Sequence, residues 1–199
     1  MKKWMTTAAA ITAAVSIALT ATPASAGTLD TVDTGSAQQR ADQLLMGVDD
    51  TTKTFDGAVA LRAGASSEDA AEFAAGYVAA GGHAENVDVS RAAVDALRGP
   101  AGEVLACSGR NSADITGLQV NLYLSSCNAD KIVAALAGGA GVAALVGIIT
   151  AATGIGGAAG GIAAALLTIG SAAVAYCAAN GRGIGFHVLP VGPPWCRSQ

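Results

Sequence analysis

Residues 132–181 read IVAALAGGAGVAALVGIITAATGIGGAAGGIAAALLTIGSAAVAYCAANG and contain no charged side chain. The stretch is long enough for two apolar helices of about 20 residues each, the length that spans a bilayer. The Gly-rich run TGIGG at residues 153–157 is typical of a bend. We therefore expect helices over residues 132–153 and 158–178 that fold back on each other as an antiparallel hairpin.

Strand-like patterns flank this predicted hairpin on both sides. In residues 117–124, Leu and Val alternate with Gln119, Asn121 and Tyr123, and residues 183–189 alternate in the same way. Because the chain enters and leaves the hairpin at the same end, the two strands should pair antiparallel. The C-terminal part is thus predicted to be a β–αα–β unit.

The N-terminal part differs in its charge. Residues 27–114 carry fourteen acidic and six basic side chains, whereas residues 115–199 have a net charge of +2. Patterning predicts helices over residues 36–46, from Ser66 or Ser67 to the Gly81–Gly82 pair, and from Ser90 to Gly99–Pro100, with a strand over residues 54–62. The fold class is therefore mainly α, a small acidic helical region followed by the β–αα–β unit. The acidic region is either a solvated surface or a pro-region that keeps the apolar segment soluble.

Residues 1–26 are predicted to be a secretory signal peptide. Lys2 and Lys3 precede an apolar segment, and Ala24, Ser25 and Ala26 supply the small residues needed for cleavage before Gly27. The predicted divisions are thus the signal peptide at 1–26, the acidic region at 27–114 and the hairpin unit at 115–199. We expect a secreted, extracellular protein.

Four cysteines remain after this predicted cleavage, namely Cys107, Cys127, Cys177 and Cys196. An even number in an exported chain indicates two disulfides, and four cysteines allow three pairings. A hairpin would bring Cys127 and Cys177 together and leave Cys107 to pair with Cys196. The Cys127–Cys177 bond would close a loop of about fifty residues and stabilise the fold by about 4 kcal/mol. The local alternative pairs Cys107 with Cys127 and Cys177 with Cys196.

The predicted hairpin is a marginal membrane segment. Its first helix has eight strongly apolar residues, which favour insertion by at most about 2–5 kcal/mol. Gly156 with Gly160, and Gly157 with Gly161, have the spacing of close helix packing. If the hairpin inserts bend first, the inserting side chains would be Ile132, Leu136, Leu145, Ile148, Ile149, Leu166, Leu167 and Ile169. The alternative is a tightly packed hairpin that forms the core of a soluble protein.

Residues 117–177 resemble the mature part of secreted actinobacterial bacteriocins. The resemblance rests on Asn121-Leu122-Tyr123 and on the Ala/Gly-rich run of residues 134–165. It implies an apolar peptide, released from an acidic leader, that permeabilises bacterial membranes. Its partners would be the lipid bilayer of target bacteria and further copies of itself.

Other function classes lack support in the sequence. The motifs of nucleophilic hydrolases, zinc proteases and nucleotide-binding enzymes are missing, so we expect no catalysis and no cofactor. His83 and His187 lack ligand spacing to a cysteine, and an acidic chain without Lys/Arg clusters argues against nucleic acid. The leading hypothesis is membrane permeabilisation by a bacteriocin-like protein. The alternative is a non-catalytic secreted or envelope-associated binding protein whose hairpin is its buried core.

Overall fold

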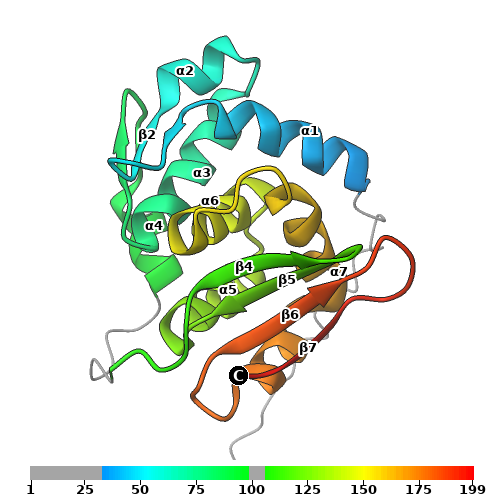
Figure 1. The fold of residues 1–199 in the computed structure, drawn as a ribbon. Helices are drawn as coiled ribbons and strands as arrows, with labels where there is room; N and C mark the ends of the chain where they lie inside the picture. Colours follow the sequence, from blue (N-terminus) through cyan, green and yellow to red (C-terminus); the bar gives the residue numbers. More distant parts are fainter. Residues whose placement is uncertain (1–32, 99–105) are drawn as a thin grey trace, which may run out of the picture.

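The computed structural model describes residues 33–98 and 106–199. The predicted signal peptide and the Gly99–Pro100 helix stop lie outside the described residues. Within these ranges the protein has a mixed α/β fold of seven helices and two small sheets (Figure 1).

The acidic N-terminal region forms four helices around a three-stranded sheet. The helices are α1 (Thr34–Leu45), α2 (Gly57–Arg62), α3 (Ser67–Ala79) and α4 (Arg91–Arg98). The sheet has the order β1 (Val48–Asp49), β2 (Thr54–Asp56) and β3 (His83–Glu85), with β1 antiparallel and β3 parallel to β2. The three predicted helices are confirmed.

The strand predicted over residues 54–62 is correct only for its first three residues. The Asp56 carboxylate accepts hydrogen bonds from the backbone N–H groups of Ala58 and Val59. This N-cap satisfies two free donors and starts α2 at Gly57, where the strand was predicted to continue. In the same way, Ser66 caps α3 through the backbone N–H of Asp69.

The C-terminal region places three helices against an antiparallel four-stranded sheet. Its strands are β4 (Ser112–Thr116), β5 (Gln119–Leu124), β6 (Ile184–Val188) and β7 (Trp195–Ser198), which neighbour one another in that order. The helices α5 (Ser126–Ala137), α6 (Val142–Thr153) and α7 (Ala159–Ala178) connect β5 to β6. The predicted antiparallel pairing of the two flanking strands is confirmed, with Leu122 opposite Phe186.

The uncharged stretch forms three helices, because the first predicted helix is broken. The run Gly138–Gly141 ends α5 and starts α6, and Gly139 has a φ of 74°, which side chains other than glycine rarely adopt. The predicted bend at residues 153–157 is present and turns at Gly154, whose φ is 69°. Within α7, Gly170 has non-helical angles and kinks the helix.

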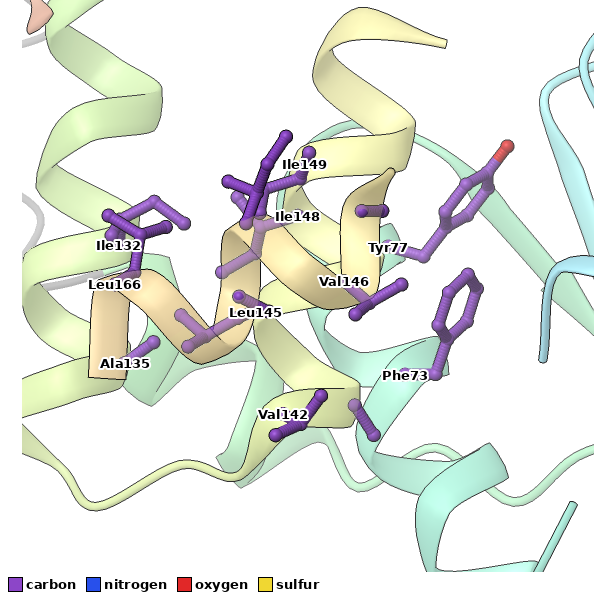
Figure 2. Close-up of a cluster of buried hydrophobic side chains, with 14 of the residues drawn as sticks. Phe73, Tyr77, Ile132, Ala135, Val142, Leu145, Val146, Ile148, Ile149 and Leu166 are labelled. Atoms are coloured by element: carbon purple, nitrogen blue, oxygen red, sulfur yellow. The ribbon is translucent and has the colours of Figure 1, made fainter. Parts of the chain in front are cut away.

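Helix α6 is the centre of the core, between the N-terminal helices and the C-terminal sheet (Figure 1). The backbones of α6 and α3 come into contact at Gly147. A Cβ on Gly147 would overlap the Phe73 carbonyl oxygen and lie 2.9 Å from the Tyr77 nitrogen. A Cβ on Gly76 would in turn overlap the Ala144 carbonyl. Figure 2 shows Phe73 and Tyr77 beside Val146 of α6. Both halves of the chain therefore share one apolar core.

The disulfides follow the local alternative. Cys107 is bonded to Cys127, and Cys177 is bonded to Cys196. The preferred pairing of Cys127 with Cys177 and of Cys107 with Cys196 was wrong, because it assumed an isolated two-helix hairpin. In the structure the first bond ties the segment before β4 to the start of α5, where Ser126 also donates to the Ser108 carbonyl at 2.8 Å. The second bond ties the end of α7 to β7.

Candidate binding face on the C-terminal sheet

None of the eight predicted membrane-inserting side chains is exposed. Five of them, Ile132, Leu145, Ile148, Ile149 and Leu166, have no exposed surface (Figure 2), and Leu136, Leu167 and Ile169 are half-buried. In this fold these side chains lie in the protein core or pack against it.

The predicted helix-packing glycines separate into two groups. Gly160 packs tightly, but against α1, because its Cβ would lie 2.8 Å from the Ala37 carbonyl oxygen and from the Ala41 side chain. The neighbouring Gly161 donates its N–H to the Gln38 side chain at 3.1 Å. Gly156 and Gly157 precede α7 and have no atom within 4 Å of an added Cβ. The GxxxG spacings therefore do not mark packing between the hairpin helices.

Helix α7 is the one helix of the described residues long and apolar enough to cross a membrane by length and composition. Only 28% of its most apolar 18-residue window is buried. Its exposed positions include Ala172, Ala175 and Tyr176. This helix thus presents an uncharged surface to solvent.

The polar side chains of this region gather on the face of the four-stranded sheet that points away from α5 and α7. Successive strand residues point to opposite faces, so Leu122 and Phe186 point into the core while Tyr123 and His187 point outward. The strand register aligns two outward rows across the sheet. One row is Asp114, Asn121, His187 and Trp195, and the other is Ser112, Tyr123, Gly185 and Arg197.

A hollow of about 460 Å³ lies along the second row, over Tyr123, Gly185 and Arg197, and is the candidate site. Gly185 has no side chain there, which leaves room between Tyr123 and Arg197. The Arg110 guanidinium lies 4.1 Å from the centre of the Tyr123 ring, close enough for a cation–π interaction. The complete lining is Arg110, Tyr123, Gly185, Arg197, Ser198 and Gln199.

The Gln199 side chain holds the rim of the hollow together. Its Oε1 accepts from the Arg110 N–H at 3.1 Å, and the two hydrogens of its Nε2 are shared among the carbonyls of Arg110, Leu124 and Ile184, which lie at 3.1, 2.7 and 3.1 Å. The backbone of Arg110 is therefore fixed beside β5 and β6. Its guanidinium stays exposed.

The two arginines carry charge that the protein does not neutralise by contact. Among residues 33–98 and 106–199, neither Arg110 nor Arg197 lies within ion-pair distance of a carboxylate. The hollow is therefore lined by two cationic side chains, although the chain as a whole has a net charge of −4.

His187 belongs to the first row, and its Nε2 would lie 3.5 Å from a Cβ added to Gly185 of the second row. Its Nδ1 lies 2.7 Å from Asn121 Oδ1 and 3.1 Å from Gln119 Nε2, and Asn121 Nδ2 donates to Asp114 Oδ1 at 2.6 Å. Burial lowers the pKa of the His187 imidazole, and the positive charge of Arg197 lowers it further. Its ring stacks on Trp195 with 5.2 Å between the centroids.

This arrangement is suited to binding an anion. In the part of the chain that the structure describes, no three His, Cys, Asp or Glu side chains lie close enough to share a metal ion.

The sequence predicted the outward alternation of Gln119, Asn121 and Tyr123. It gave no signal for Arg110, Gly185 or Arg197, because their proximity depends on the register of strands far apart in the sequence.

Comparison with protein families, curated proteins and solved structures found no match to this chain. The resemblance to bacteriocins stays a prediction from the sequence.

Proposed function

We propose that the protein is an exported, non-catalytic binding protein that takes up a small anionic ligand on its C-terminal sheet. The apolar helices serve as its core. The observation that carries the proposal is the hollow floored by Gly185, at which Arg110 and Arg197 stand without a carboxylate partner among the described residues.

The chemistry of these side chains favours a carboxylate or a phosphate. Arginine presents a planar set of donors that matches both groups, and charge-assisted hydrogen bonds of this kind are about twice as strong as neutral ones. The volume of about 460 Å³ is in the range of small-molecule sites, about 300–1,000 Å³. The two disulfides are consistent with an oxidising, extracellular environment.

Burial of the apolar helices supports a soluble protein over a released membrane peptide. Leu145, Ile148 and Ile149 contribute fully buried side chains to one core with α3. To insert into a bilayer, α6 would have to leave its contacts with Phe73 and Tyr77. The estimated gain from insertion, at most about 2–5 kcal/mol, is comparable to the about 2–5 kcal/mol that one large side chain contributes to a core.

The test measures binding of inorganic phosphate and of citrate to the protein, by calorimetric titration and by changes in NMR chemical shifts. Gly185→Val should block binding, because a Cβ at this position meets Tyr123 and His187 at ordinary distances of 3.4 and 3.5 Å and the two methyl groups beyond it would occupy space next to the Tyr123 ring where the ligand would lie. Arg197→Gln should weaken binding about tenfold or more, as expected for a charged hydrogen bond of about 1.5–3 kcal/mol.

Arg182→Gln is the matched control, because Arg182 is exposed and does not line the hollow. It should bind both anions as the unchanged protein does. Equal binding by the Gly185→Val and unchanged proteins would overturn the proposal, as would an equal loss in the Arg182 control.

Membrane permeabilisation is the second candidate, favoured by the uncharged and partly exposed α7. The test is dye release from liposomes by the oxidised protein. Ala172→Asp is the informative variant, because it places a charge on an exposed position of α7 without disturbing the core. Release that this variant abolishes would favour permeabilisation, and an absence of release would favour the binding protein.

A further inference from the structure

The ligand class follows from a second feature of the same face, the exposed ring of Trp195. Trp195 and Arg197 are two residues apart in β7, so they point to the same side of the sheet, about 7 Å apart along the strand. The register places them opposite His187 and Gly185. An aromatic ring therefore lies next to Arg197, one of the two cationic side chains that line the hollow.

Trp195 is held in place before any ligand arrives. One side of its indole stacks on His187, with 25° between the ring planes, while 41% of the residue stays exposed. The next residue, Cys196, is bonded to Cys177 of α7 and fixes the strand. His187 is in turn held by Asn121. Little conformational entropy is lost when a ligand stacks on a ring that is already ordered.

We propose that this face binds an acidic saccharide, with the sugar ring on the exposed side of Trp195 and its carboxylate or phosphate between Arg110 and Arg197. The inference rests on the proposed anion site. The C–H bonds of a pyranose face carry partial positive charge, which the electron-rich face of an indole attracts. An acidic substituent on that ring would reach the neighbouring hollow.

A nucleotide fits the same surface less well. Bases also stack on aromatic side chains, but specific recognition of a base adds donors and acceptors directed at its edge. In the Trp195 row, Asn121 and His187 are each only 4% exposed and bond to each other and to Asp114 or Gln119. The side-chain amide of Asn121 and the Nδ1 of His187 are thus engaged within the sheet, which leaves this row few groups that could contact the edge of a base.

The experiment compares five ligands in calorimetric titrations of the oxidised full chain. Glucuronic acid and glucose 6-phosphate carry both the ring and the charge, with a carboxylate in one case and a phosphate in the other. Inorganic phosphate has no ring, glucose has no charge, and uridine monophosphate presents a base. We expect one or both acidic sugars to bind at least about tenfold more tightly than phosphate and than uridine monophosphate.

Two variants test the role of the ring. Trp195→Ala should weaken binding of the acidic sugar about tenfold or more, the loss expected from the stacking of bases on aromatic side chains. The same variant should leave the affinity for phosphate unchanged. Trp195→Phe keeps an aromatic surface and should retain most of the affinity for the acidic sugar. This pair separates stacking from a general loss of structure.

The outcomes distinguish the two proposals. One outcome is that phosphate binds and depends on Gly185 and Arg197 as expected, while the acidic sugars bind no more tightly than phosphate. That result would overturn the saccharide inference and leave the proposal of an anion site intact. Equal or tighter binding of uridine monophosphate also overturns it. Failure of every anion to bind overturns both.

Discussion

The packing of α6 against α3 predicts that replacing Gly147 with alanine destabilises the protein. Considered as an isolated helix, α6 should gain about 1 kcal/mol when this glycine becomes alanine. In the structure the new methyl group would overlap the Phe73 carbonyl oxygen and lie 2.9 Å from the Tyr77 nitrogen. Both atoms belong to the backbone of α3, so the strain is relieved only if the two helices move apart.

Overpacking of a well-filled core costs about 1–3 kcal/mol, and contacts with backbone lie at the upper end because no side chain can rotate away. With the gain in helix propensity subtracted, Gly147→Ala should lower the free energy of unfolding by about 2 kcal/mol. For a chain of this size the melting temperature should fall by about 4–8 °C.

The assay is urea unfolding of the oxidised protein, followed by circular dichroism. Gly161→Ala is the matched control, because its Cβ would lie 3.8 Å from Gln38 Oε1, an ordinary contact. This control should be as stable as the unchanged protein or more stable. A Gly147→Ala protein at least as stable as the unchanged one would refute the account of the α3–α6 contact.

Three further predictions concern the cap of α6, the pH dependence and the disulfides. Glu72 Oε1 accepts from the Gly141 N–H at 3.0 Å at the start of α6, so Glu72→Ala should cost about 1–2 kcal/mol in urea unfolding. An unchanged stability would show that this cap contributes nothing. Because the pKa of folded His187 is lowered, the unfolded chain binds the proton first, and stability should fall as the pH drops below about 6.5. His187→Gln should flatten that part of the profile between pH 7.5 and 5.5, and an identical slope would contradict the assignment. Peptide mapping without reduction should recover Cys107 linked to Cys127, and the Cys177→Ser/Cys196→Ser double variant should lose about 3 kcal/mol. A Cys127–Cys177 peptide would contradict the fold.

Much of the fold could be predicted from the sequence because its signals are local. The alternation around Leu122 and Phe186 indicated two strands that pair, and the pair Ser66 and Ser67 indicated the start of α3, of which Ser66 is the N-cap. The break at Gly138–Gly141 was missed, since apolar residues continue on both sides of it and hydropathy does not register a turn. That error led to the wrong disulfides, because the preferred pairing depended on a simple hairpin.

The candidate site was less predictable. Arg110, Gly185 and Arg197 come from three segments of the chain and meet only through the pairing of β5, β6 and β7. A missing side chain such as that of Gly185 creates a hollow only when its neighbours across the sheet are known. The close approach of Gly76 to α6 likewise could not be predicted from the residue pattern of either helix alone.

The central claim is that the apolar stretch is the core of a folded protein, and hydrogen exchange of the α6 amides tests it most directly. The measurement compares the oxidised protein alone with the protein mixed with anionic liposomes. We predict that the amides of Val142–Thr153 are among the slowest to exchange and that liposomes leave their rates unchanged. Rapid exchange in solution, with protection appearing only when liposomes are added, would contradict the account.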